Sequence, residues 1–338
     1  MFCSQPKRSI TTLQLLTQLG LEHGLDLHTC LEGCGLTPLQ LADTQHEIEP
    51  QQELRMVANL TQALAHISDL GLQAGLRYQL TTYGIWGYAM LSSQSFRQAA
   101  ELGLRYLDLT FALTQISLSE DEEDAHLHFA DEHLPNALRD FLVLRDSVAV
   151  LVIQRELTSR AIRLSQVHLR MPAPKDPQPF IAQFGVLPHF ASTCNRISFA
   201  RALLDEPLPR ANPAMAKLCE EQCQALLAKR RVRSGLAGQV RDLLLRQPGY
   251  LPDMEQVAKA LNLSSRSLRR RLLEQGSSFR QLQEEVRQTL AEALLSNSTL
   301  SQAQIAERLG YSEAANFLHA FKRWKGQTPQ DYRRLSSK

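Results

Sequence analysis

EQVAKALNLSSRSLRRRLLEQGSSF (residues 255–279) and AQIAERLGYSEAANFLHAFKRWKGQTP (residues 303–329) are two copies of one pattern. When they are laid over each other, residues of the same kind coincide at offsets of 48 to 50: Val257-Ala258 with Ile305-Ala306, Leu261 with Leu309, Ser264 with Ser312, Leu268 with Phe317, Leu272 with Phe321, and Gly276 with Gly326. A pattern that recurs within one segment indicates repeated structure. We therefore expect two similar units within residues 234–338, in a domain built only of helices.

Each copy has the order of a helix-turn-helix. A short helix carries a small residue, Ala258 or Ala306, where two helices must approach closely. A turn follows at Asn262 or Gly310, residue types that tolerate a left-handed backbone. A serine then opens a second helix as its N-cap. The pattern predicts helix-turn-helix units at about residues 253–274 and 301–325.

The segment between the copies predicts a connecting helix. Its apolar residues fall on one stripe: Phe279, Leu282, Val286, Leu290 and Leu294. A helix over residues 278–295 is about 27 Å long at 1.5 Å per residue. A rigid connector of that length suits two recognition helices placed about one turn of DNA apart, roughly 34 Å. We expect one protomer to contact two successive major grooves.

The second helix of the first copy carries four arginines, Arg266, Arg269, Arg270 and Arg271. Burial of Leu268 and Leu272 turns the first three toward the exposed N-terminal part of the helix, which a recognition helix places in the major groove. The arginine fork can bond guanine O6 and N7 together, at about 1–3 kcal/mol of discrimination per pair. We predict base contacts for these three and a position nearer the DNA backbone for Arg271. A solvated basic helix face is the alternative.

Charge is distributed unevenly along the 338 residues. The whole chain has a formal net charge of +2, but residues 210–338 hold 22 Lys and Arg against 12 Asp and Glu, a net of +10. Residues 1–209 hold 15 against 23, a net of −8. A basic domain joined to an acidic one indicates that only the C-terminal part faces a polyanion, with nucleic acid the first choice.

The N-terminal half predicts an α+β domain. Residues 10 to about 80 have helical spacing, with Pro38 and Pro50 where helices start, and Ser95 is placed to cap another helix. Residues 111–120 and 125–131 alternate as strands do, residues 136–157 return to helical spacing, and residues 165–174 and 195–205 again predict strands around a short helix at 177–185. We expect a mixed sheet with helices on one face, after a helical bundle.

The domain boundary is predicted at EPLPRANP, residues 206–213, because its prolines block both helix and central strand. We therefore assign residues 1–209 to a regulatory domain, 210–233 to a linker and connecting helix, and 234–338 to DNA binding. No apolar run approaches the roughly 20 residues that a membrane span needs. The leucine-rich N-terminus lacks a small-residue cleavage site, so we expect a cytoplasmic protein with reduced thiols.

Several residues of the N-terminal half are candidates for binding a small molecule. Tyr83, Trp86 and Tyr88 cluster with two glycines, a combination that can line a pocket, although a turn in the core is the alternative. Arg77 and Arg105 can bond an anionic effector through both nitrogens of the fork, with surface ion pairing as the alternative.

Two other patterns allow metal or redox chemistry. His126 and His128 share one face of a strand, yet no further ligand is evident, so we expect no metal. Cys30/Cys34 and Cys219/Cys223 are each four residues apart and bring two thiols to one helix face. Such pairs can bind a soft metal or sense oxidation, but buried small hydrophobic side chains are the commoner outcome.

The segment IAERLGYSEAANFLHAFKRWKGQTPQDYRR, residues 305–334, closely resembles the signature of the AraC/XylS family of bacterial transcription regulators. The resemblance extends over about residues 235–334. YGIWGYAMLSS and CNRISFARALLDEPLPRANPAMAKLCEEQC are similar to the sensor domain of the subgroup that includes ornithine-utilisation regulators, described as arabinose-binding-like. This resemblance implies an effector-binding domain that also allows homodimers.

The resemblance implies which residues face DNA. In the first unit these are Ser264, Ser265, Arg266, Arg269 and Arg270; in the second they are Ala315, Asn316 and His319. His319 stands where the family commonly has arginine, so we expect the second unit to contribute less base contact. Backbone contacts are expected there instead, from Lys322, Arg323, Lys325 and the amide groups at Ser312 and Thr328.

The sequence thus predicts a sequence-specific transcription regulator that responds to an effector, in the first place an activator of a catabolic or virulence-type operon, with double-stranded DNA and RNA polymerase as partners. Two alternatives stay open: an architectural DNA-bending protein, and an alkyl-transfer repair enzyme on the same DNA domain. Neither a catalytic Ser/His/Asp arrangement nor a phosphate-binding glycine loop is evident, so we expect no enzymatic activity and no cofactor.

Overall fold

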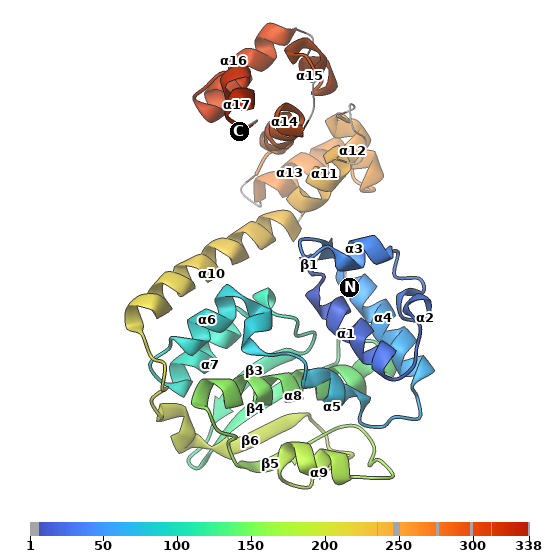
Figure 1. The fold of residues 1–338 in the computed structure, drawn as a ribbon, viewed down its shortest axis with the longest axis vertical. Coiled ribbons are helices and arrows are strands. Elements are labelled where there is room, and N and C mark those ends of the chain that lie inside the picture. Colours follow the sequence, from blue (N-terminus) through green and yellow to red (C-terminus); the bar gives the residue numbers. More distant parts are fainter. Residues whose placement is uncertain are drawn as a thin grey trace. The chain divides into compact units, whose positions relative to one another are not determined.

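The computed structural model describes residues 7–234, 236–245, 251–274, 277–297, 300–311 and 313–336. Its contacts divide the chain into two compact units, residues 1–230 and 231–338. The first unit combines helices with β-sheet, and the second contains only helices among its described residues (Figure 1). The predicted fold class is confirmed for both parts of the chain.

The first unit contains both short and long helices. They are α1 (Thr11–Glu22), α2 (Leu27–Leu31), α3 (Pro38–Ala42), α4 (Pro50–Ala63), α5 (Leu70–Gly75), α6 (Ile85–Leu91), α7 (Phe96–Arg105), α8 (Arg139–Thr158), α9 (Gln178–Phe184) and α10 (Pro213–Ser234). The predicted starts at Pro38 and Pro50 are confirmed, since both prolines occupy the first turn, where no N–H is needed. The Ser95 side chain accepts a hydrogen bond from the Gln98 amide at 3.3 Å and caps α7 as predicted.

The main sheet has four strands in the order β3-β4-β6-β5. These are β3 (Gln115–Glu120), β4 (Asp124–Ala130), β5 (Leu164–His168) and β6 (Arg196–Ala200). Every neighbouring pair is antiparallel, where a mixed sheet was predicted, because β5 pairs with β6 and not with β4. The strand predicted over residues 195–205 ends at Ala200, and a 3-10 helix follows (Arg201–Asp205). A two-stranded sheet of β1 (Arg8–Ser9) and β2 (Glu47–Ile48) was not predicted.

Helix α8 lies beside the sheet and supplies the centre of the first core (Figure 1). Alternate residues of β4 point inward, and Leu127 and Phe129 pack in the same cluster as Val148 and Leu151 of α8. Helix α5 crosses α8 closely: a Cβ added at Gly75 would lie 2.6 Å from the carbonyl oxygen of Arg145. Glycine is therefore needed on α5 to let the two backbones approach.

Charged side chains also lie inside this unit. Glu53 on α4 is fully buried, and its carboxylate accepts hydrogen bonds from Arg145 at 2.6 Å and Arg8 at 3.1 Å. Arg145 also pairs with Asp146 at 2.8 Å and donates to the carbonyl of Phe111 at 2.9 Å. Two positive and two negative charges thus compensate one another, which is the condition for burying them.

The second unit is a chain of helices. They are α11 (Leu236–Leu245), α12 (Met254–Ala260), α13 (Ser265–Glu274), α14 (Phe279–Asn297), α15 (Gln302–Arg308), α16 (Ala314–Lys325) and α17 (Pro329–Ser336). Two hydrophobic clusters form here, one around α12 and α13 and one around α15 and α16. The connecting helix α14 supplies Leu282 and Val286 to the first cluster, and Ala291 and Leu295 to the second. The predicted connector is confirmed as a helix of 19 residues.

Candidate nucleic-acid interface and effector pocket

The first helix-turn-helix consists of α12, a turn and α13. Asp253 and Gln256 form a capping box that starts α12. In the turn, Asn262 adopts a left-handed φ of 54°, as its residue type predicts. The Ser264 hydroxyl accepts a hydrogen bond from the Ser267 amide at 3.2 Å, so the predicted N-cap of α13 is present.

The packing of α13 decides which side chains it exposes. Leu268 and Leu272 are fully buried in the first cluster, as predicted, and the helix can turn only its remaining faces to solvent. The side chains of Arg266, Arg269 and Arg270 are all exposed. Of these, Arg270 lies 3.6 Å from Glu274 one turn later, a weak surface pair. The exposed side chains also include Arg271 and Ser264, while Ser265 is half-buried.

The second helix-turn-helix repeats this geometry with α15 and α16. Ser301 and Gln304 form the capping box of α15, and Gly310 in the turn has a φ of 73°. Phe317 and Phe321 are fully buried, as their matches on α13 are. The predicted base-facing side chains, Ala315, Asn316 and His319, are exposed. Ser312 lies outside the described residues.

The cations of α16 are engaged by the connector. Arg323 pairs with Glu284 of α14, and the Trp324 indole donates to the same carboxylate at 3.0 Å. These two donors hold the pKa of Glu284 below its ordinary value. Lys325 lies 2.7 Å from Glu292. The predicted phosphate contacts by Arg323 and Lys325 therefore compete with ion pairs inside the unit, whereas the Lys322 side chain is exposed.

Three further contacts stabilise the second helix-turn-helix and the helix that follows it. The Arg287 guanidinium on α14 donates to the carbonyl of Leu309 at 3.0 Å and lies 5.0 Å from the centre of the Tyr311 ring. The Thr328 hydroxyl caps α17 by accepting from the Asp331 amide at 3.2 Å. The turn is thereby held to the connecting helix α14, and α17 has a capped start.

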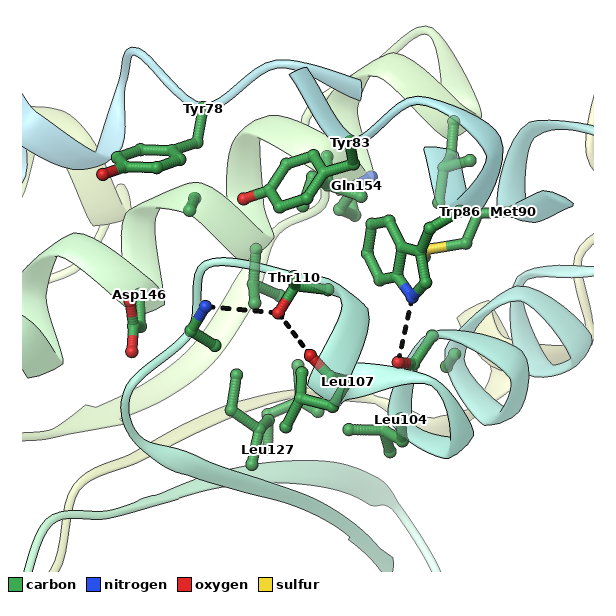
Figure 2. A pocket seen from close by; sticks show the side chains of 18 of the residues that line it. Tyr78, Tyr83, Trp86, Met90, Leu104, Leu107, Thr110, Leu127, Asp146 and Gln154 are labelled. Atoms are coloured by element: carbon green, nitrogen blue, oxygen red, sulfur yellow. Dashed lines mark hydrogen bonds between the residues drawn. The ribbon is translucent and has the colours of Figure 1, made fainter. Parts of the chain in front are cut away.

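An apolar pocket of about 80 Å³ lies in the first unit. Its walls come from α6, α7, the 3-10 helices at Leu80–Tyr83 and Leu107–Leu109, strands β3 and β4, and α8. Tyr83 packs with its ring centre 5.0 Å from that of Trp86 and 5.4 Å from that of Phe111. Figure 2 shows Tyr78, Tyr83 and Trp86 on one side of this space and Thr110 and Leu127 on the other.

The structure brings only part of the predicted effector site together. Tyr83 and Trp86 line the pocket, but Tyr88 does not and is 59% exposed. Arg77 pairs with Glu22, and Arg105 with Glu220 of α10, so neither guanidinium lines the pocket. For both arginines the structure has the ion pairing that the sequence left as the alternative.

Two family models match the chain. One, described as "Arabinose-binding domain of AraC transcription regulator, N-term", matches residues 24–208, which is more than half of the chain. The other, described as "Helix-turn-helix domain", matches residues 257–335. The chain belongs to the AraC family of transcription regulators. The resemblance seen in the sequence is thereby confirmed for both halves of the chain.

Relatives of this AraC-family regulator match it nearly end to end. The "Uncharacterized HTH-type transcriptional regulator Rv1395" of Mycobacterium tuberculosis is 32% identical, with 98% of this chain and 97% of the relative covered. The "Ornithine utilization regulator" of Pseudomonas aeruginosa is also 32% identical, with 95% and 94% covered. The crystal structure of the transcriptional regulator CdpR from Pseudomonas aeruginosa matches with a TM-score of 0.45 and 25% identity, covering 88% of this chain and 96% of that one. This AraC-family chain is a transcription regulator with a DNA-binding helix-turn-helix domain.

The two candidate metal-binding histidines of this AraC-family regulator, His126 and His128, have protein partners. His126 meets Ser198 and Asp121, both at 2.9 Å, and His128 meets Ser119 at 2.8 Å. Within the described ranges, no group of three or more His, Cys, Asp or Glu side chains is placed to hold a metal ion. Among those same residues, no helix is both long and apolar enough to cross a membrane.

Both cysteine pairs are buried. Burial raises the pKa of Cys34 and that of Cys223 to about 11, and it also raises the pKa of Cys30 and Cys219 above the ordinary value. Thiols that react or sense oxidants are exposed and have lowered pKa values. The geometry therefore favours a packing role, and it also weighs against the alkyl-transfer alternative for these four thiols.

Sequence reasoning missed most of the pocket. Its polar side chains include Thr110, which sequence reasoning did not single out, and Asp146 and Gln154, which lie in the segment predicted only as a helix. One signal was available: Arg145-Asp146 interrupts a long apolar stretch of the predicted helix over residues 136–157. A charged pair in a helix that is apolar on all sides indicates a buried ion pair at a packed site.

Proposed function

We propose that this AraC-type regulator binds specific DNA sites through α13 and α16, and that an effector in the pocket of the first unit changes this binding. One observation carries the DNA part: three arginines are exposed on α13 opposite a fully buried leucine pair. In this proposal Arg266, Arg269 and Arg270 contact guanine edges, and Ser264 and Ser265 bring the helix start to the phosphates.

For the second helix-turn-helix, α15 and α16, we propose a smaller share of base contact. Asn316 offers an amide that can bond adenine, whereas His319 and Ala315 offer less. Lys322 and the first turn of α16 contribute backbone contacts. Sequence preference should then rest mainly on the half-site under α13.

The proposed route from effector to DNA domain runs through α10. Cys219, Cys223 and Leu227 of α10 pack in the same hydrophobic cluster as Trp86, which lines the pocket. Arg105 at the end of α7 pairs with Glu220 of α10. A shift of α6 or α7 on ligand binding therefore acts on α10, which covers most of the segment 210–233 that the sequence assigns to the connection between the domains.

We further propose that the regulator acts in the cytoplasm as an activator that contacts RNA polymerase, and as a homodimer. The exposed side chains of Met215, Leu218 and Leu226 on α10 favour the dimer, because apolar side chains on one helix are a common dimer contact. The sensing residues then lie within 1–209 and the DNA-binding residues within 234–338.

The test is binding-site selection from random DNA with the full-length protein, followed by affinity measurements over a range of salt. Arg266→Ala and Arg269→Ala should each lower the preference for the selected site over other DNA by about 1–3 kcal/mol. Arg271→Ala is the matched control, and it should weaken binding to all sequences alike. An unchanged preference for the selected site in both Arg266→Ala and Arg269→Ala would refute base contact by α13.

A further inference from the structure

The polar groups that line the pocket are already occupied. Asp146 accepts from the amides of residues 113 and 114, at 3.0 and 2.9 Å, and pairs with Arg145. Gln154 donates to Thr158 at 2.7 Å and to the carbonyl of Arg160 at 3.0 Å. Both amide hydrogens of Gln154 and the carboxylate of Asp146 therefore already have partners inside the protein.

Three other polar groups of the lining also have internal partners. Thr110 donates to the Leu107 carbonyl at 2.7 Å and accepts from the Ala112 amide at 3.2 Å, and the Trp86 indole donates to the Gly103 carbonyl at 3.3 Å (Figure 2). The Tyr78 hydroxyl, also at the pocket, bonds Thr12 at 2.8 Å.

Tyr83 differs from these groups. Its hydroxyl lies toward the open space in Figure 2 and makes no hydrogen bond within the part of the chain that the structure describes. Removal from water raises the pKa of this phenol, so the hydroxyl keeps its proton and can both donate and accept. It is the available polar group of an otherwise apolar wall.

The charge of the pocket lining and the volume of the cavity restrict the class of ligand further. Asp146 is the charged side chain of the lining, and no Lys, Arg or His belongs to the lining. An anionic ligand would therefore meet no cation, and a cation would compete with Arg145 for a carboxylate that is already paired. The cavity of about 80 Å³ is smaller than the roughly 150 Å³ apolar cavity that accepts benzene, so the ligand can be no larger than a single ring, and a ring requires flexible side chains of the wall such as Met90 to move.

We propose that the effector is a small, uncharged, mainly apolar molecule with one hydrogen-bonding group, which meets the Tyr83 hydroxyl. This inference rests on the proposed function, since it names the ligand class of the same pocket. A polyol or a charged amino acid is disfavoured, because all but one of its polar groups would be buried without partners, at about 1–3 kcal/mol each.

The test uses the full-length protein and four probes: phenol, benzene, L-arabinose and L-ornithine. Binding is followed by titration calorimetry and by ligand-observed NMR. We expect phenol and benzene to bind and the two polar probes not to bind. Tyr83→Phe should weaken phenol about five-fold, the effect of one neutral hydrogen bond, and leave benzene unchanged. Tyr88→Phe, the matched control at an exposed tyrosine, should leave both unchanged.

Ala100→Leu, which places extra carbons into the pocket wall, should abolish binding of both rings, while circular dichroism verifies that the variant is folded. Tighter binding of L-arabinose or L-ornithine, lost in Ala100→Leu, would overturn the proposal, as would phenol binding that Tyr83→Phe does not weaken. Absence of ring binding in a protein that still selects its DNA site would also overturn it and leave the DNA-binding proposal standing. Ring binding without any change in DNA affinity would support the ligand class and refute the effector role.

Discussion

Replacing Arg145 with methionine tests the buried charge network most directly. Methionine keeps much of the side-chain length but removes the guanidinium that joins Glu53 and Asp146. Glu53 is then left with Arg8 and Thr12 in a fully buried position, and the carbonyl of Phe111 loses one donor. Acidic groups without enough compensation inside the core destabilise the folded state.

The expected cost is about 3–5 kcal/mol, the range for removing one partner of a buried ion pair. In a unit of this size each 1 kcal/mol lowers the midpoint of thermal unfolding by about 2–4 °C, so the midpoint of the first unit should fall by about 6–20 °C. Arg160→Met is the matched control. Arg160 pairs with Glu206 at the surface, where both side chains are exposed, so its loss should cost less than about 1 kcal/mol.

Calorimetry on the full-length variants measures both midpoints. A second comparison adds Glu53→Gln to the Arg145→Met variant, because the neutral amide removes the uncompensated charge. We expect the double variant to be less destabilised than the sum of the single ones. Equal midpoints for Arg145→Met and Arg160→Met, or strictly additive effects of the two buried substitutions, would refute the coupled network.

Three further predictions follow from other contacts. Glu284→Gln should free Arg323 and strengthen DNA binding, and the slope of log K against log salt concentration should become steeper by about 0.9 for each added phosphate contact. The control is Glu307→Gln, which removes an exposed charge on α15. An equal effect of the two substitutions would contradict the role of the Glu284–Arg323 ion pair. Gly75→Ala should destabilise the first unit by about 1–3 kcal/mol in thermal unfolding, because its Cβ would meet the α8 backbone at 2.6 Å; a rise in stability would disprove the tight crossing. At pH 8 the pKa of about 11 leaves Cys223 almost wholly protonated, with about a hundred-fold less thiolate than the ordinary value of 9.0 allows. A thiol reagent should therefore label Cys223 far more slowly in the folded protein than in urea. Rapid labelling of the folded protein would support the redox-sensor hypothesis, as would DNA binding that responds to oxidant in the wild type but not in the Cys219→Ser/Cys223→Ser variant.

The helix-turn-helix units were predictable because their determinants are local. Helix starts, the turn at Asn262 and the buried stripe of Leu268 and Leu272 all depend on residues within about ten positions of one another. The capping boxes at Asp253 and Ser301, which recur at the same offset of 48, were equally visible in the sequence but were not used.

The pocket and the charge network were not predictable in the same way, because their partners lie far apart in the chain. Glu53 and Arg145 are 92 residues apart, and Arg105 and Glu220 are 115 residues apart. Nothing local to Arg105 distinguishes an arginine that meets an effector from one that meets a glutamate across the fold. Likewise β1 and β2 have two residues each, too few to show the alternation that identifies a strand.

The connecting helix α14 gives the cations of α13 and those of α16 different electrostatic surroundings. In the described part of the second unit, Arg266 and Arg269 of α13 make no ion pair, and their charge is available to DNA. On α16, in contrast, Arg323 faces Glu284 of the connector. Binding a phosphate there requires the carboxylate to be displaced, which offsets part of the gain. Phosphate contacts by α16 should therefore be weaker than the basic composition of the helix indicates, even though the two helix-turn-helix motifs share one architecture. If α13 and α16 contact DNA as proposed, the acidic side chains of the connector should reduce the attraction of α16 for DNA of any sequence, and binding should depend on a good match under α13.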